Sequence, residues 1–281
     1  MWGQDDFEKS MKLDYPGRDA AYKERYRNAE KVGYEYLKRA GIWDKIGEWS
    51  SDMISTGTGW YNLAVLWDHI KTYKPRYFLE CGAGVSTHVI AEAMERFCDY
   101  DDMRLVSMEH QPMYYEDVLN HRPKQTFVDI ILSEVCLENI YTFLMSGYKD
   151  IPFLPYSMVF VDGPPQDTFI AGDLFWVISN AEEPVIGIID SRALTSYVYY
   201  MILGPRFVSR LGHSTYKVGP ITNKELDYRQ LGADPWKRAE ILERIGYIIE
   251  STLQAKNVIE RKNDGSRDQE GSRVSSVGGV R

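Results

Sequence analysis

The sequence has few cysteines, no long apolar run and no excess of positive charge. Its three cysteines, Cys81, Cys98 and Cys136, form no CxxC pair and no metal-ligand spacing, which favours reduced thiols over a disulfide framework. No run approaches the ~20 apolar residues that a membrane helix needs. The polar, acidic stretch 1–14 is unlike a secretory signal. We therefore expect a cytoplasmic protein with no membrane partner.

The charge balance further limits the kinds of partner that the protein can bind. The chain has 33 basic and 41 acidic residues, a formal net charge of −8. Nucleic-acid binding needs a basic face that displaces phosphate counterions, so no nucleic-acid partner is expected. With 44% hydrophobic and 13% aromatic residues in a chain of 281, a sizeable core is available.

Short apolar segments alternate with helical ones along the middle of the chain. Residues 17–50 have helical character, and a second helix through 60–70 ends before Pro75. Strands are predicted at 77–80, 104–109, 126–132, 157–162 and 184–190, and helices at 85–97, 113–120, 168–181 and 193–203. Segments 206–211 and 214–218 read as a strand pair at one edge. This alternation predicts an α/β protein with a parallel sheet covered on both faces.

The chain divides into four predicted parts. Residues 1–55 form an N-terminal helical segment, a cover or lid, and residues 56–222 a Rossmann-like domain. Residues 223–261 form a helical extension with an amphipathic helix at about 235–260, whose apolar face suits self-association into a homo-oligomer. Residues 262–281 are rich in Gly and Ser and lack aromatics, as in a disordered tail.

Acidic residues stand at four predicted strand ends: Glu80, Glu109, Asp162 and Asp190. In an open parallel sheet, ligands bind beyond the carboxyl ends of the strands. The repetition of carboxylates at this edge is therefore the main functional signal in the sequence.

A glycine turn follows the first of these strands, at Gly82-Ala-Gly84, and leads into the helix that starts near Val85. Glycines allow a tight turn and a close ligand approach, and the helix start points amide groups at the ligand. The third glycine of the dinucleotide pattern GxGxxG is replaced by Thr87, which counts against a dinucleotide. Glu109, one strand later, stands where an acidic residue binds ribose hydroxyls.

Three motifs together resemble class I S-adenosylmethionine-dependent methyltransferases, in a small-molecule branch. They are YFLECGAGVST at 77–87, Met108-Glu109-His110, and VFVDGPP at 159–165, whose VDGPP ends the fourth strand. The resemblance covers about residues 58–218. It implies a Rossmann-like three-layer sandwich with a seven-stranded, mostly parallel sheet and an antiparallel last strand.

The resemblance also implies S-adenosylmethionine as the cofactor. Its methionine part would lie near Glu80, Gly82 and Gly84, its ribose on Glu109, and its adenosine beside His110, with Ser133 and Glu134 near the adenine. The implied cofactor-binding residues are Glu80, Gly82, Gly84, Ser86, Thr87, Glu109, His110 and Asp162.

Methyl transfer from a sulfonium is an in-line displacement, so the protein must align the two atoms and sometimes remove a proton. Asp162 is the best candidate for contact with the reacting centre, and Asp190 ends the next strand. In metal-dependent O-methyltransferases of this fold, carboxylates at these strand ends bind a metal such as Mg²⁺. Ser191 departs from that pattern, Arg192 can neutralise Asp190, and two carboxylates fall short of a full ligand set. A divalent metal such as Mg²⁺ is therefore not the expected cofactor, and Asp162 and Asp190 would be its ligands if one is present.

The expected activity is methyl transfer to a small-molecule acceptor, at oxygen by similarity to O-methyltransferases. Three alternatives stay open. One is methyl transfer to nitrogen, another is an NAD-dependent oxidoreductase on a similar sheet, and the third is a non-catalytic interaction protein that retains the fold.

Overall fold

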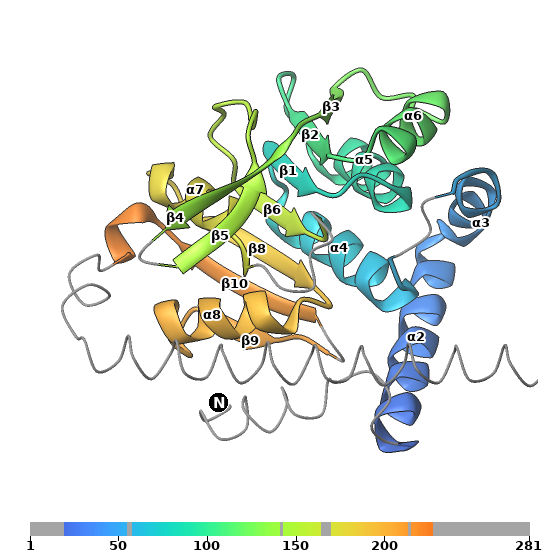
Figure 1. The fold of residues 1–281 in the computed structure, drawn as a ribbon. Helices are drawn as coiled ribbons and strands as arrows, with labels where there is room; N and C mark the ends of the chain where they lie inside the picture. Colours follow the sequence, from blue (N-terminus) through green and yellow to red (C-terminus); the bar gives the residue numbers. More distant parts are fainter. Residues whose placement is uncertain (1–19, 55–57, 141–142, 164–169, 213–214, 227–281) are drawn as a thin grey trace, which may run out of the picture. The chain divides into compact units, whose positions relative to one another are not determined.

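A computed structural model describes residues 20–54, 58–140, 143–163, 170–212 and 215–226 (Figure 1). Its centre is a seven-stranded sheet in the order β3-β2-β1-β6-β8-β10-β9. The strands are β1 (Tyr77–Cys81), β2 (Arg104–Glu109), β3 (Val128–Leu132), β6 (Met158–Val161), β8 (Val185–Asp190), β9 (Val208–Arg210) and β10 (Thr215–Ile221). The pairs from β3 to β8 are parallel, whereas β10 is antiparallel to both neighbours. The predicted fold class is confirmed.

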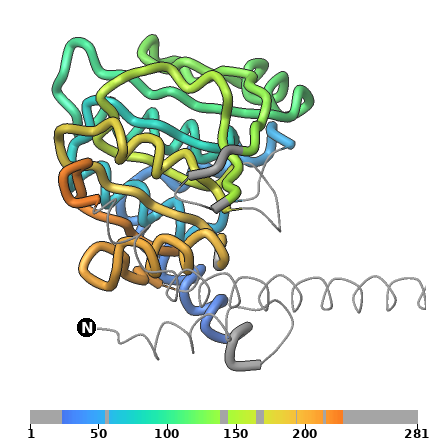
Figure 2. Tube along the Cα trace, turned by 60° about the vertical axis from the view of Figure 1, so that its left-hand side comes forward, coloured from blue at the N-terminus to red at the C-terminus, as the bar shows by residue number. Residues whose placement is uncertain are grey.

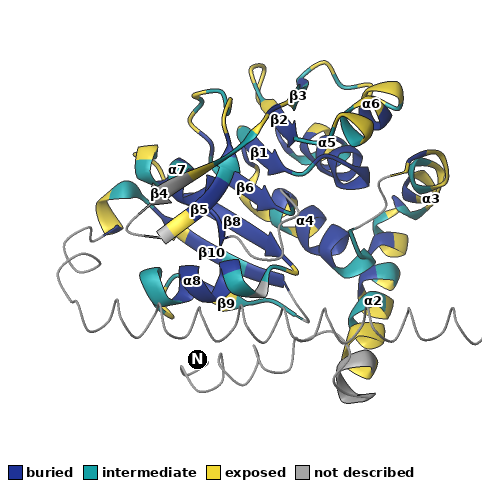
Figure 3. Cartoon of the chain, viewed as in Figure 1, coloured by how far each residue is buried: buried dark blue, intermediate teal, exposed yellow. Residues whose placement is uncertain are grey.

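Helices cover both faces of this sheet. Phe78, Phe160 and Ile188 share one apolar core with helices α4 (Trp60–Tyr73) and α5 (Val85–Phe97). On the other face, α7 (Asp173–Asn180) packs so closely that a Cβ on Gly187 would lie 2.2 Å from a Leu174 methyl carbon. The central strands are buried along their length (Figure 3), because a parallel sheet sandwiched by helices has no solvent face.

The predicted N-terminal helical segment forms two helices, α2 (Ala20–Ala40) and α3 (Trp43–Asp52), which separate at Gly41 with a φ of +75°. The carboxylate of Glu30 in α2 accepts hydrogen bonds from the main-chain N–H groups of Trp60, at 2.8 Å, and Tyr61, at 3.4 Å. These N–H groups belong to the first turn of α4, which has no earlier carbonyl partner for them. The contact ties α2 to the helix that precedes the sheet.

A hairpin that the sequence analysis did not predict lies between β3 and β6. Strands β4 (Val135–Ile140) and β5 (Phe143–Tyr148) pair antiparallel, and β7 (Ile170–Ala171) pairs with β5 in parallel to complete a second, three-stranded sheet. The hairpin lies beside β7 and α7 (Figures 1 and 2).

The predicted helix at 168–181 was wrong at its start. Ile170 and Ala171 are strand residues, and α7 covers only Asp173–Asn180. The edge of β5 supplies main-chain partners to this segment, including a 2.7 Å hydrogen bond from Gly172 N to Ser146 O. Tertiary pairing therefore overrides the helical tendency of Ile170 and Ala171.

The other predicted elements are close to those observed. Helices α6 (Pro112–Asn120) and α8 (Ala193–Leu203) follow β2 and β8, and the 3-10 turn η1 (Asn223–Glu225) follows β10. The extension after residue 226, its amphipathic helix and the tail at 262–281 lie outside the described residues, so the four-part division stays a prediction. Within the described part of the chain, no helix is long and apolar enough to cross a membrane.

Candidate functional site

A pocket opens at the carboxyl ends of β1, β2 and β6, at the sheet edge where the sequence predicts ligand binding. It encloses about 490 Å³ of space, including its open mouth. Its lining residues are Thr58, Gly82, Ala83, Gly84, Val85, Ser86, Glu109, Gln111, Tyr114, Asp162 and Gly163. The pocket thus joins the glycine turn, Glu109 and Asp162, which are far apart in the sequence.

The glycine turn is shaped by a close approach between two strand-end loops. Gly82 has a φ of +102°, and a Cβ there would lie 2.7 Å from the main-chain nitrogen of Gly163. A Cβ on Gly163 would in turn lie 2.5 Å from the hydroxyl of Tyr148. Because no side chain fits at either point, both residues must be glycine for β1 and β6 to end side by side.

Glu80 lies beneath this turn rather than in the pocket. Its side chain is fully buried, and its carboxylate accepts hydrogen bonds from Ser86 at 2.6 Å, Thr87 at 2.7 Å and Ser107. Burial raises the pKa of Glu80 to about 7, an effect that these three hydroxyls oppose. Glu80 therefore orders the first turn of α5 from below.

The two hydroxyl residues of the turn differ in position. Ser86 lines the pocket, whereas Thr87 is fully buried and accepts a 3.0 Å hydrogen bond from the main-chain N–H of Gly84. Thr87 stands where a dinucleotide-binding loop has its third glycine, and its hydroxyl here links Gly84 to Glu80.

Glu109 is held in place by the start of the segment that follows it. Its Oε1 accepts hydrogen bonds from the main-chain N–H groups of His110 and Gln111, both at 2.8 Å, and lies 3.1 Å from His110 Nδ1. Its other oxygen, Oε2, accepts no hydrogen bond from the described residues. Glu109 lines the pocket while His110 does not, so the structure brings only the first of these two to the pocket wall.

Asp162 lines the same pocket from the end of β6. Its Oδ2 accepts a 3.0 Å hydrogen bond from Thr58 Oγ1, and its main-chain oxygen accepts one from Arg192 Nη2. Burial raises the pKa of Asp162, and the positive charge of Arg192 opposes that rise. This bond places Thr58, two residues before α4, against the residue that was predicted to contact the reacting centre.

Asp190 lies next to Asp162 but outside the pocket lining. Val161 pairs with Ile189, so the following residues occupy neighbouring positions on adjacent parallel strands, which are separated by about 4.8 Å. Asp190 Oδ1 accepts hydrogen bonds from Asn62 Nδ2 and from Ser191 Oγ, the latter at 2.7 Å. Burial, followed by the charge of Asp162, raises the pKa of Asp190 to about 7.

Asn62 is a site residue that the sequence analysis missed. It is buried on α4, donates to Asp190, and accepts a hydrogen bond from Thr215 through its own Oδ1. Thr215 is also the residue that pairs with Asp190 across β8 and β10. The sequence did contain a signal for it, a lone amide side chain within the apolar run of α4. A buried amide requires hydrogen-bond partners, so such a residue indicates polar groups nearby.

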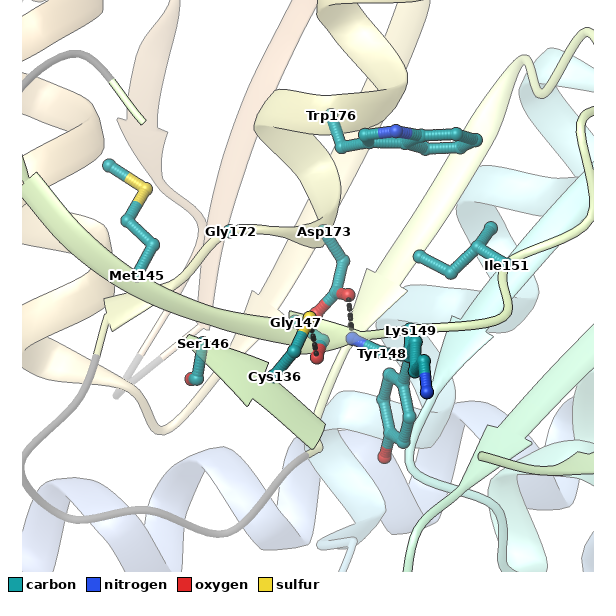
Figure 4. A pocket seen from close by; sticks show the side chains of 10 residues that line it. All are labelled: Cys136, Met145, Ser146, Gly147, Tyr148, Lys149, Ile151, Gly172, Asp173 and Trp176. Carbon is teal, nitrogen blue, oxygen red and sulfur yellow. Dashed lines mark hydrogen bonds between the residues drawn. The ribbon is translucent and has the colours of Figure 1, made fainter. Parts of the chain in front are cut away.

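A second cavity lies between β5 and α7 (Figure 4). Asp173, at the start of α7, accepts a 2.8 Å hydrogen bond from the main-chain N–H of Tyr148, and burial raises its pKa to about 7. The cavity is lined by Cys136, Met145, Ser146, Gly147, Tyr148, Lys149, Ile151, Gly172, Asp173 and Trp176. Tyr148 separates it from the first pocket, since its hydroxyl faces Gly163.

Ser133 and Glu134, the residues expected near the adenine, line neither of these two pockets. The Ser133 hydroxyl accepts a 3.1 Å hydrogen bond from the main-chain N–H of Asp150. Ser133 therefore connects the end of β3 to the end of the hairpin.

Comparison with known proteins gives no family for this chain. No protein-family model matches it, and neither does any curated protein. Among solved structures, it is similar to an O-methyltransferase of Streptomyces achromogenes, TomG, in complex with SAM, with 14% identity, 79% of this chain and 97% of that chain covered, and a TM-score of 0.41. A Klebsiella pneumoniae putative O-methyltransferase gives the same identity and coverages with a TM-score of 0.42.

A third similar structure is an O-methyltransferase from Bacillus cereus in complex with SAH. It shares 12% identity over 75% of this chain and 97% of that chain, with a TM-score of 0.41. At such low identities and TM-scores, the fold assignment of this chain rests on its own strand order, and the ligands of those proteins do not carry over to it.

Proposed function

We propose that the chain is an S-adenosylmethionine-dependent methyltransferase that acts on a small-molecule acceptor, at oxygen. The observation that carries the proposal is the position of Glu109 in the pocket wall, with Oε1 held by two main-chain N–H groups. The unpaired lone pairs of its carboxylate suit the two hydroxyls of a ribose. The adjacent glycine turn admits a ligand without a side-chain barrier.

Asp162 supports the same proposal from the opposite side of the pocket. A carboxylate there attracts a sulfonium centre, and its hydrogen bond to Thr58 fixes where its charge points. Asp190, which lies next to Asp162 outside the pocket lining and has a pKa raised to about 7, is suited to take up near neutral pH the proton that transfer to oxygen releases. In this proposal, Asp162 contacts the reacting centre and Asp190 acts behind it.

Glu80, Thr87 and His110 then have supporting roles. Glu80 and Thr87 hold the glycine turn in shape through the hydroxyl network beneath it. His110 positions Glu109, because its main-chain N–H and its ring nitrogen both lie against Oε1. The cofactor itself contacts Gly82, Gly84, Ser86, Glu109 and Asp162.

Calorimetric titration of the full chain with S-adenosylmethionine, S-adenosylhomocysteine and NAD tests the proposal. We expect the first two to bind, and Glu109→Ala to weaken both by roughly 10- to 100-fold, the loss expected for a charged hydrogen bond. Glu116→Ala, which removes an exposed carboxylate from α6 outside the pocket, is the matched control.

Binding of NAD alone contradicts the proposal and favours an oxidoreductase. No binding of any of the three ligands by folded protein favours an interaction protein that retains the fold. If both methyltransferase ligands bind, a screen of hydroxyl and amine acceptors distinguishes transfer to oxygen from transfer to nitrogen.

A further inference from the structure

Asp162 and Asp190 are the two carboxylates around which a metal site was considered. A hard cation such as Mg²⁺ takes about six oxygen ligands, and its protein ligands must present lone pairs to it. In the described part of the chain, no group of three or more His, Cys, Asp and Glu side chains is placed to hold a metal ion. The groups around the pair decide whether a metal fits.

The groups around Asp190 present hydrogens rather than lone pairs. Asn62 Nδ2 and Ser191 Oγ both donate to Oδ1 of Asp190. The carbonyl oxygen of Asn62, the atom that could bind a cation, is taken by the hydroxyl of Thr215. These donors stabilise a negative Asp190, and their hydrogens close that oxygen to a metal.

Asp162 has one such donor on its carboxylate and another on its main-chain oxygen. Thr58 donates to its Oδ2 at 3.0 Å, and Arg192 Nη2 donates to its main-chain oxygen. Arg192 follows Asp190 by two residues and its Nη2 contacts Asp162, so a permanent cation already lies beside the pair within the chain. Its charge also opposes the rise in pKa of both carboxylates.

We infer that Arg192 supplies at Asp162 and Asp190 the positive charge that a divalent metal would supply, while Asn62 and Thr58 hold the two carboxylates. Arg192 is in this sense a positioning residue, and methyl transfer needs no added metal. The acceptor is then oriented through hydrogen bonds and not through chelation by a metal. The inference rests on the proposed function only in that Asp162 is taken to face the acceptor, with Asp190 behind it.

The test is a titration with Mn²⁺, followed by the electron paramagnetic resonance signal of the free ion. Four full-length chains are compared: wild type, Asn62→Asp, Arg192→Met, and the double variant. The double variant has three carboxylates and no guanidinium, so we expect it to bind Mn²⁺ at least about tenfold more tightly than wild type. Asn62→Asp alone keeps the cation and is expected to leave the free-ion signal as in wild type.

Two results overturn the inference. One is Mn²⁺ binding by the wild type that disappears in Asp190→Asn. The other is a double variant with unchanged circular dichroism that binds Mn²⁺ no better than wild type. Because the first result needs only the wild type and Asp190→Asn, it can be reached even if the double variant does not fold.

Turnover gives a second measurement once an acceptor is known. We expect wild-type kcat to be unchanged by a chelator, to fall at least about tenfold in Arg192→Met, and to recover partly with added guanidinium ion. Arg192→Lys is expected to keep more activity than Arg192→Met. A chelator that abolishes turnover contradicts the inference, whereas a wild type that binds no S-adenosylmethionine contradicts the proposed function and leaves the Mn²⁺ comparison intact.

Discussion

The two sides of the pocket hold their carboxylates in different ways. On the β1–β2 side, the partners of Glu80 and Glu109 are nearby in sequence, except for Ser107, which lies 27 residues from Glu80 on the neighbouring strand. On the β6–β8 side, the Thr58–Asp162 and Asn62–Asp190 partners are 104 and 128 residues apart. The first side is built mainly from local turns, and the second requires α4 to be packed in place.

This difference has a physical consequence for unfolding. Local hydrogen bonds form when one turn forms, whereas contacts over a hundred residues form only with the tertiary fold. We therefore expect the β6–β8 side to depend on the docking of α4, and so on its anchors, Glu30 in α2 and Tyr61, whose hydroxyl donates to Leu211 O at 2.7 Å. The β1–β2 side depends on the shape of its own loops.

The substitution with the largest expected effect is Gly82→Ala, because the β1–β2 side depends on loop shape. An alanine would adopt a φ of +102° and place its Cβ 2.7 Å from Gly163 N. Strain and overpacking together should reduce the free energy of unfolding by about 3 kcal/mol or more. Urea denaturation measures the loss, and calorimetry should show weaker cofactor binding.

Gly47→Ala is the matched control for that substitution. Gly47 lies inside α3, and a Cβ there meets nothing within 4 Å. An alanine at this helical position should stabilise the protein by about 0.5–1 kcal/mol. If Gly82→Ala behaves like Gly47→Ala, the close approach of the two strand ends does not shape the pocket.

The same contrast explains what could be predicted from the sequence. The GxG turn, the bounds of α5 and α8 and the acidic strand ends follow from neighbouring residues, and so they were predicted. The hairpin β4–β5 was missed because its apolar residues are interrupted by Glu138, Asn139 and Ser146. Asn62 and Thr215 were missed as site residues because only the packing of α4 against β8 and β10 brings them to Asp190.

The second prediction compares one hydrogen-bonding side chain from each side of the pocket. Asn62→Leu removes a donor from buried Asp190 and leaves the Thr215 hydroxyl without its acceptor, which should cost about 2 kcal/mol of stability. Ser86→Ala removes one of the three hydroxyls on Glu80 and should cost about 1 kcal/mol. Chemical denaturation of both variants measures which one loses more stability. Equal losses of stability would contradict the distinction between the two sides of the pocket.

A third prediction concerns the pH dependence of stability. Burial raises the pKa of Glu80 from 4.5 to about 7, so between these values the folded chain holds a proton that the unfolded chain has lost. The contribution of Glu80 to stability therefore falls by about 1 kcal/mol per pH unit as the pH rises through this range.

Glu80→Gln should remove that slope. The pKa values of Asp173 and Asp190 are also raised to about 7, so the variant keeps their share of the pH dependence and loses only one contribution. Unfolding free energies measured between about pH 5 and about pH 7 test this. Glu116→Gln, at an exposed position, should follow the wild-type curve, and a Glu80→Gln curve parallel to wild type would mean that Glu80 stays ionised in the fold.

The smallest expected change in stability comes from a comparison of two strand ends, each followed by a residue with a positive φ. At the end of β1, a φ of +102° requires glycine, whereas Ser191 after β8 has a φ of +50°, within the left-handed region open to other residues. Ser191 adopts this mildly strained conformation, and its hydroxyl donates to Asp190 Oδ1 at 2.7 Å.

Ser191→Ala keeps the strain and loses the hydrogen bond, so it should cost about 1 kcal/mol of stability. Ser191→Gly loses the same bond but relieves the strain, so its stability should stay within about 0.5 kcal/mol of wild type. Thermal unfolding of the two variants measures the difference, and a glycine variant no more stable than the alanine variant would show that the turn at Ser191 is unstrained.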